Sequence, residues 1–231
     1  MLRRRESPTA SRSLPAAAMT NHPTQNGVSM TIDVHQITRL HETTVRRWHD
    51  SGIDNPYDGF LMLVCVQHQQ NYRLWHQEDI ARSPDASDAE IAQVKRSIDR
   101  LNQQRNNLIE ALDEALIDEL AAAGVAPRPD ARLNTETPGS AIDRLSILAL
   151  RIYHMQEQAE RADASEQHRA ACREKLDVLG QQHADLAGSL EELLDDVFAG
   201  RKLLRIYRQF KMYNDPATNP YLYQARGRSA A

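Results

Sequence analysis

Two long stretches of this sequence carry apolar residues at alternating steps of three and four positions. This spacing lines the apolar side chains along one stripe of an α-helix, the stripe through which antiparallel helices pack. The first stripe comprises Ile91, Val94, Ile98, Leu101, Leu108 and Leu112, and the second comprises Cys172, Leu176, Leu179, Leu186, Leu190, Leu193 and Val197. The chain is therefore expected to fold as long, mutually packed helices.

The composition excludes most alternatives to a helical fold. With only 9 glycines and 10 prolines in 231 residues, the chain lacks the frequent turns of sandwiches, propellers and βαβ folds. Its length suffices for one large domain with a buried core. A formal net charge of −4 does not favour general nucleic-acid binding. We therefore expect an all-α, up-down bundle of five to six helices.

Proline, glycine and capping residues predict where the helices begin and end. Ser87 followed by Glu90 forms a capping box, and Ser83-Pro84 ends the preceding helix because proline disfavours helix in the residue before it. The expected helices cover residues 34–49, 56–82, 88–123, 140–164, 165–199 and 201–213. The expected organisation is a disordered leader over 1–32, a bundle domain over 33–215 and an extended tail over 216–231.

The chain shows no sign of secretion or membrane insertion. Its first 30 residues hold four arginines against one glutamate and no long apolar run, which indicates a disordered leader, a transit peptide or a true start at Met19 or Met30. The densest apolar run, 60–66, is too short to span a bilayer. Cys65 and Cys172 form no CxxC motif, so neither a disulfide framework nor a zinc knuckle is indicated. A cytoplasmic protein is expected.

Two rows of polar residues occupy positions that helix geometry turns inward. The first row comprises His68, Asn71, Tyr72, Trp75, Glu78, Asp79 and Arg82, and the second comprises Asp99, Asn102, Asn106, Glu110 and Asp113. One interpretation is a solvated face, which is how most charge rows are used. The other is a polar network that lines a cleft, which the two asparagines favour because asparagine is a poor helix former.

Several blocks of the sequence resemble a known family. Residues 71–82 read NYRLWHQEDIAR, residues 95–106 read KRSIDRLNQQRN, and later blocks are DRLSIL at 143–148 and YRQFKMYNDP at 207–216. These blocks are similar to the bacterial family of domains of unknown function numbered 4254. The resemblance covers about residues 35–223, and it implies an all-helical single domain without an assigned activity.

The first functional hypothesis is a polar site for a small anionic ligand or a partner. Arginine suits such a site because its planar guanidinium binds carboxylate and phosphate oxygens in pairs. The same residues could instead form an ion-pair network that only fixes the register of the helices. The candidate residues are Trp75, His76, Glu78, Asp79, Arg82, Asp99, Asn102, Arg105, Asn106 and Arg144, and Arg151 is the alternative to Arg144.

The second hypothesis is a metal-dependent phosphohydrolase. Glu110 and Asp113 lie one helical turn apart, and Glu78 and Asp79 on the preceding helix could face them. Four converging carboxylates would suit Mg²⁺ or Mn²⁺, as in the all-α nucleotide pyrophosphohydrolases. The doubled E-E-x-x-E of those enzymes is missing, so the first expectation remains a protein without a cofactor.

The third hypothesis concerns the C-terminal segment. From residue 201 onward the chain has seven basic residues against one acidic residue, interleaved with aromatic residues. This pattern suits single-stranded nucleic acid or an anionic surface. The simpler interpretation is a short helix that packs on the bundle and faces the acidic residues at 191–196. Homo-oligomer formation stays open.

Overall fold

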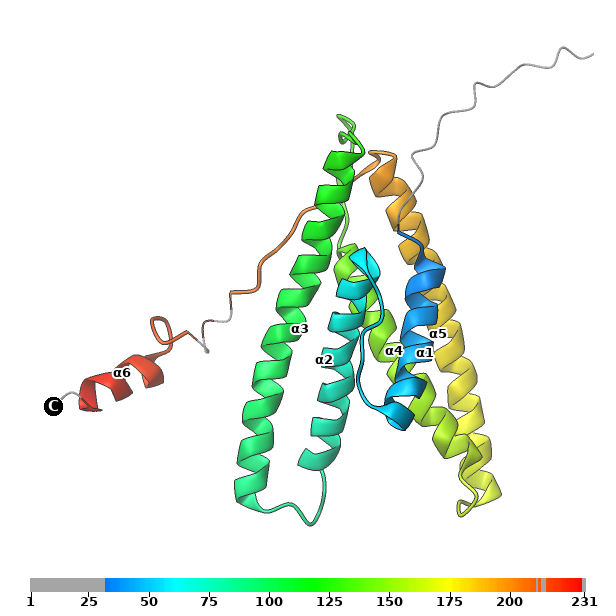
Figure 1. Ribbon diagram of the computed structural model, residues 1–231, viewed down its shortest axis with the longest axis vertical. Helices are drawn as coiled ribbons and strands as arrows, with labels where there is room; N and C mark the ends of the chain where they lie inside the picture. The colour runs from blue at the N-terminus through cyan, green and yellow to red at the C-terminus, as the bar shows by residue number, and fades with distance from the viewer. Residues whose placement is uncertain (1–31, 211, 213–214, 230–231) are drawn as a thin grey trace, which may run out of the picture.

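The computed structural model describes residues 32–210, 212 and 215–229 of the chain. Within this part, six helices carry almost all of the regular structure, which confirms the expected all-α bundle (Figure 1). The helices are α1 (Val34–Ser51), α2 (Gly59–Ala81), α3 (Asp88–Ala122), α4 (Pro138–Glu160), α5 (Glu166–Phe198) and α6 (Pro220–Ser229). None of the helices in the described ranges is long and apolar enough to cross a membrane.

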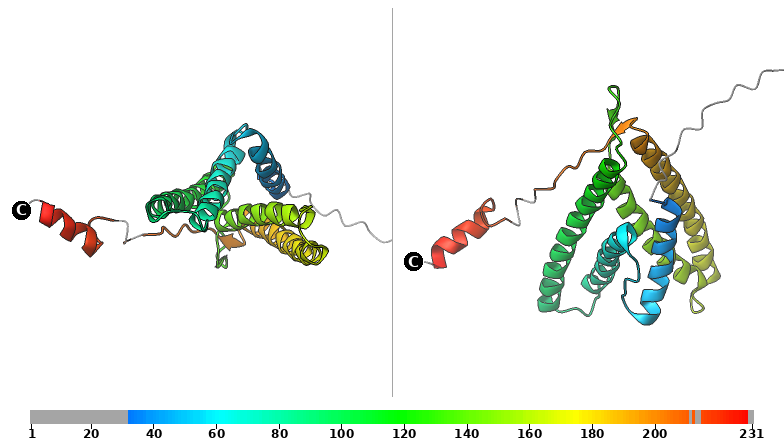
Figure 2. Two further views of the ribbon diagram at one scale, coloured as in Figure 1. Left: turned by 90° about the horizontal axis from the view of Figure 1, so that it is seen from below. Right: turned by 45° about the horizontal axis from the view of Figure 1, so that its top comes forward.

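The bundle consists of two antiparallel hairpins and one additional helix. α2 pairs with α3, and α4 pairs with α5, while α1 packs mainly against α4. α2 to α5 alternate in direction, and α1 runs in the same direction as α2 (Figure 1). The two hairpins diverge toward the α2–α3 and α4–α5 turns, so the molecule has a forked outline (Figure 2). α4 is the helix that contacts every other long helix.

The core lies where the hairpins meet. Its fully buried side chains include Ile37, Leu112, Ile142, Leu145 and Leu194, which come from α1, α3, α4 and α5. The predicted stripes enter this core only in part. Leu176 and Leu179 are half-buried and Ile91 is 39% exposed, because they lie toward the diverging ends of the hairpins.

Side-chain caps fix the beginnings of the helices. The capping box of Ser87 and Glu90 starts α3 as predicted, and Asp33, Thr137 and Ser165 cap α1, α4 and α5. The helix starts are therefore encoded locally, by side chains that accept hydrogen bonds from the first free N–H groups. The predicted leader, apart from the buried Ile32, lies outside the described residues.

The C-terminal part differs from the prediction. The helix expected over 201–213 was wrong, because Lys202–Leu203 forms strand β2 and residues 204–210 continue without helix. β2 pairs in parallel with β1 (Arg132–Leu133), a contact between distant segments that local periodicity does not encode. The tail expected to be extended instead contains α6, where the side chain of Asn219 accepts a hydrogen bond from the N–H of Tyr221.

Candidate functional site

A buried carboxylate ties three helices together at the centre of the bundle. Asp143 on α4 is 3% exposed, and its Oδ1 accepts hydrogen bonds from Gln67 Nε2 at 2.5 Å and from Asn71 Nδ2 at 3.0 Å. Arg105 on α3 donates to the same carboxylate from Nε at 2.7 Å and from a terminal nitrogen. The hydrogen bond to Asp143 raises the pKa of Arg105. The network is therefore charge-balanced within itself.

Ser146 forms a second node one turn further along α4. Its hydroxyl oxygen lies 2.8 Å from Asn71 Nδ2 and 2.7 Å from Nδ1 of His68, which is fully buried. Sequence reasoning missed Gln67, Asp143 and Ser146 as members of this network. The signal that could have found them is a polar residue inside an otherwise apolar stretch, such as Asp143 within 141–150.

A cavity of about 480 Å³ lies beside this network, between α2, α3 and α4. It contains six of the ten residues predicted for the ligand site, and the structure thus brings these six together. The lining residues are Asn71, Leu74, Trp75, Glu78, Asp79, Arg82, Asn102, Arg105, Ile147, Leu150 and Arg151. Arg151, the alternative to Arg144 in the sequence-based hypothesis, lies in this lining, whereas Arg144 does not.

The ion pairs of the cavity leave one guanidinium without a carboxylate. Arg82 pairs with Glu78 at 2.5 Å, and Arg105 is held by Asp143. Arg151 is exposed and makes no ion pair within the described ranges. The exposed carboxylate of Asp79 likewise makes no ion pair in the described residues. A ligand in this cavity would therefore meet one unpaired cation and one unpaired anion.

The other four predicted ligand residues do not line this cavity. Asp99 is exposed and accepts a hydrogen bond from Lys95 at 2.7 Å, and Asn106 is half-buried. Arg144 pairs with Glu136 at 2.8 Å in a second cavity. His76 packs edge-on against Tyr72, with ring centroids 4.5 Å apart.

Burial and the neighbouring rings of His49 and His154 lower the pKa of His76. The three rings come from α2, α1 and α4, and their centroids lie 5.1 to 6.0 Å apart. His154 also stacks on Trp75, at 4.5 Å with the planes 9° apart. His76 thus belongs to an aromatic contact between helices that supports the wall of the cavity.

The structure does not bring the four predicted metal ligands together. Asp113 is 2% exposed, its Oδ1 accepts the N–H of Gly139 at 2.7 Å, and burial raises its pKa. Glu110 accepts the N–H of Gln209 at 2.9 Å. Neither lines the cavity that contains Glu78 and Asp79. In the described part of the chain, no group of three or more histidine, cysteine or acidic side chains is arranged to hold a metal ion.

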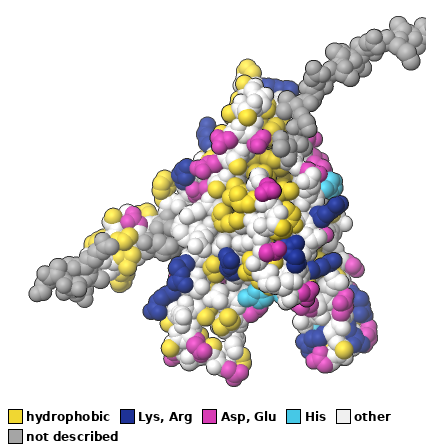
Figure 3. Space-filling view, viewed as in Figure 1, with side chains coloured by type: hydrophobic (Ala, Val, Ile, Leu, Met, Phe, Trp, Pro, Cys, Tyr) yellow, Lys and Arg dark blue, Asp and Glu magenta, His cyan; other side chains and the backbone are white. Residues whose placement is uncertain are grey.

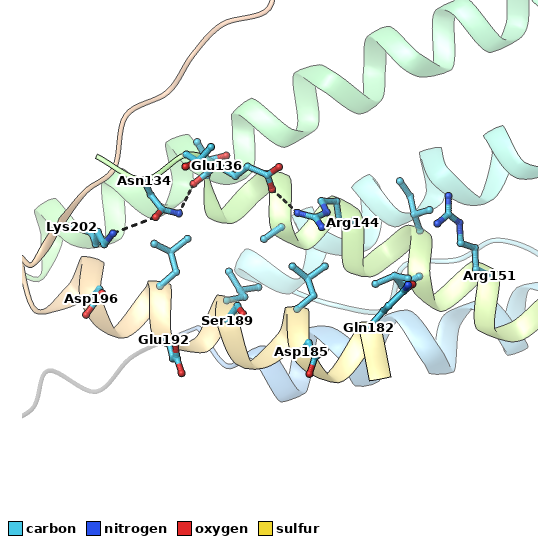
Figure 4. Close-up of a pocket in the computed structure, with 18 residues that line it drawn as sticks. Asn134, Glu136, Arg144, Arg151, Gln182, Asp185, Ser189, Glu192, Asp196 and Lys202 are labelled. Carbon is cyan, nitrogen blue, oxygen red and sulfur yellow. Dashed lines mark hydrogen bonds and ion pairs between the residues drawn. The ribbon is translucent and has the colours of Figure 1, made fainter. Parts of the chain in front are cut away.

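The second cavity is larger, about 1070 Å³, and lies along α4 and α5 below the segment that contains β1. Figure 4 shows Arg144 directed at Glu136 and Lys202 directed at Asn134, with acidic side chains along α5. Most of its lining residues are polar, and its half-buried apolar members are Ile147, Leu186 and Leu193. Arg151 also lines this groove, but Arg144 is already paired and Asp185, Glu192 and Asp196 add negative charge, so the groove offers less to a small anion than the first cavity does.

Comparison with known proteins gives one match. A family model described as a protein of unknown function (DUF4254) matches residues 61–206. No curated protein and no solved structure matches the chain. The matched residues contain the Asp143 network and the whole lining of the smaller cavity, and they end before the C-terminal segment that carries α6.

Proposed function

This chain belongs to the DUF4254 family, whose description assigns no activity, and we propose that its smaller cavity binds a small organic ligand with one anionic group. The observation that carries the proposal is the guanidinium of Arg151. It lines a cavity that also contains Trp75, and it forms no ion pair with a carboxylate in the described residues. An arginine fork binds a carboxylate through two parallel hydrogen bonds.

The charges of the cavity favour a ligand with a single negative group. Arg82 and Arg105 are each engaged by an acid, and Asp79 adds a negative charge without an ion pair. A polyphosphate would meet only one available guanidinium and would be repelled by Asp79. A monocarboxylate has its charge matched by Arg151 alone.

The remaining lining suits an apolar or aromatic body. Leu74, Ile147 and Leu150 supply apolar surface, and Trp75 is held in place by its stacking on His154. A volume of about 480 Å³ lies within the range of cavities that enclose small ligands. Asn102 adds an amide that can orient a polar substituent.

The proposal is tested by titration calorimetry with benzoate, phenylacetate and indole-3-carboxylate, each compared with its neutral amide. We expect at least one acid to bind more tightly than its amide. Arg151→Gln should weaken that binding by about 10- to 100-fold, since a hydrogen bond to a charged group contributes about 1.5–3 kcal/mol. Arg144→Gln, in the larger groove, is the matched control and should bind as the wild type does.

Arg151 also lines the larger groove, so a second pair of variants locates the ligand. Of these two cavities, Asn102→Leu changes only the smaller one and Gln182→Leu changes only the larger groove. We expect the first variant to alter the affinity and the second to leave it unchanged. The proposal is rejected if no acid binds in preference to its amide, or if only Gln182→Leu alters the binding.

A further inference from the structure

The C-terminal arm, defined as the described residues 204–210, 212 and 215–229, leaves the bundle and exposes large apolar side chains. It starts beside α5, passes α3 and ends in α6 at a distance from both hairpins (Figures 1 and 2). Figure 3 shows apolar atoms on its surface. The exposed fractions are 61% for Tyr207, 85% for Phe210, 62% for Met212, 87% for Tyr221, 39% for Leu222 and 48% for Tyr223.

The first part of the arm is held on the bundle by polar contacts. Arg208 pairs with Glu110 at 3.4 Å and also with Glu114, and the N–H of Gln209 donates to Glu110 at 2.9 Å. These contacts direct the chain past α3, on the side away from α5 (Figure 1). Several large apolar side chains exposed on one segment mark a surface that another surface can cover.

The groove along α4 and α5 has the dimensions to receive α6. From Gln182 to Asp196 it follows α5 for about 21 Å at 1.5 Å per residue, and the 10 residues of α6 measure about 15 Å. Its volume is about 1070 Å³, and its half-buried apolar lining residues are Ile147, Leu186 and Leu193, within a lining that is otherwise mostly polar. A groove between two helices can receive a third helix through such apolar side chains.

The α5 side of the groove and the end of the arm carry opposite charges, while the basic side chains of the groove, Arg144, Arg151 and Lys202, lie on α4 and β2. Asp185, Glu192 and Asp196 lie along the α5 side of the groove (Figure 4), and Glu192 forms no ion pair within the described part of the chain. Residues 216–231 contain Arg226 and Arg228 and no acidic residue. Opposite charges at the rim of an interface fix its register and exclude other partners.

We propose that the α6 end of the arm binds in the α4–α5 groove of a second copy of this chain. Because each copy has one arm and one groove, a two-fold axis allows a reciprocal exchange that closes as a dimer. A second copy is favoured over the same copy because the arm runs past α3, away from its own α4–α5 face (Figure 2). The exposed apolar side chains of α6, Tyr221, Leu222 and Tyr223, are then covered.

The first experiment measures the mass of the full chain by light scattering during gel filtration at about 100 μM. We expect twice the 26.2 kDa of one chain. Tyr221→Ser combined with Tyr223→Ser should give a monomer, and Tyr207→Ser, which lies before the proposed contact, should remain a dimer. A monomeric wild-type chain overturns the proposal.

The second experiment tests which groove receives which arm. A chain with Ser189→Cys is mixed with a longer, tagged chain that carries Tyr221→Cys, and disulfide formation is followed on a denaturing gel. The native Cys65 and Cys172 are buried and provide little background. We expect a cross-link between the two chains of different size. A third chain carries both Ser189→Cys and Tyr221→Cys. If this chain forms a disulfide within itself and the mixed chains form none between them, the arm folds back on its own groove and the proposal is overturned.

A charge exchange makes the test independent of apolar contacts. Glu192→Arg should weaken the dimer, and adding Arg226→Glu with Arg228→Glu in the same chain should restore it. If Glu192→Arg weakens the dimer and the two added substitutions do not restore it, the proposed register is wrong. Arm-dependent retention on a single-stranded oligonucleotide by a monomeric chain would assign the arm to nucleic acid instead and would equally overturn the proposal.

Discussion

Arg105 on α3 and Asp143 on α4 form a two-point ion pair, in which Nε donates at 2.7 Å to one carboxylate oxygen and a terminal nitrogen donates to the other. The two residues are 38 positions apart in the sequence. The side chain of Asp143 is 5% exposed and that of Arg105 is 26% exposed. This pair joins the two hairpins at the point where they begin to diverge, and it leaves Arg105 unavailable as the main anion-binding group.

Asp143→Asn should be strongly destabilising. The substitution removes the charge that balances a largely buried guanidinium, and it replaces one of the two oxygens that accept from Arg105 with an amide NH2, which is a donor. Breaking a buried pair on one side costs about 3–5 kcal/mol of unfolding free energy. Urea unfolding followed by circular dichroism measures this loss. Asp99→Asn, which removes only an exposed pair with Lys95, should change the unfolding free energy by less than about 1 kcal/mol.

Gly139→Ala should disrupt the contact between α3 and α4. A Cβ at this position would lie 2.5 Å from the carbonyl oxygen of Ile109 and 2.9 Å from Oδ1 of Asp113, so a helix backbone would have to move. Overpacking of this kind costs about 1–3 kcal/mol. Gly180→Ala in α5 is the matched control, since no atom lies within 4 Å of its Cβ, and it should be neutral or stabilising by up to about 1 kcal/mol. Equal effects of the two substitutions on thermal unfolding would contradict the close approach.

Acid should destabilise the fold through its buried histidines. Burial lowers the pKa of His68 to about 3 and lowers the pKa of His41 well below its usual value. The unfolded chain then binds more protons than the folded chain below about pH 6.5, so stability is lost as the pH falls from there toward the folded pKa. Each such histidine contributes a slope of about 1.4 kcal/mol per pH unit.

His41→Leu isolates this effect, because neither ring nitrogen of His41 has a hydrogen-bond partner in the described residues. Urea unfolding between pH 7 and pH 5 should show a slope smaller than that of the wild type. The exposed His35→Leu serves as the control and should leave the slope unchanged. Parallel pH profiles for wild type and His41→Leu would show that His41 is not held neutral in the fold.

Glu78→Gln should make the smaller cavity more receptive to a second negative charge. The substitution releases Arg82 from its ion pair, in which the side chain of Arg82 is 71% exposed and that of Glu78 is 43% exposed. Exposed pairs contribute about 0.2–1 kcal/mol, so the affinity for phthalate relative to benzoate should rise about two- to fivefold. Calorimetry measures this ratio, and Glu136→Gln, which releases Arg144 in the larger groove, should not change it.

Much of the fold was predictable because its signals are local. The capping box at Ser87 and Glu90 and the turn at Ser83-Pro84 define the α2–α3 hairpin from a few neighbouring residues. The false helix over 201–213 shows the limit of such signals. Its apolar residues have helical spacing, but the backbone of Lys202–Leu203 pairs with a strand about 70 residues earlier, and no local pattern reports that partner.

The sequence by itself determined the five long helices, the capping box of Ser87 and Glu90 and the alignment of Trp75, Glu78 and Arg82 along one face, because residues three or four positions apart lie on one face of a helix. Only the tertiary structure decided which charges cancel. It pairs Arg105 with Asp143 and Arg144 with Glu136, and it leaves Arg151 without an ion pair in the described residues. Charge pairing depends on distances through space between helices, and these distances are set by how the hairpins pack.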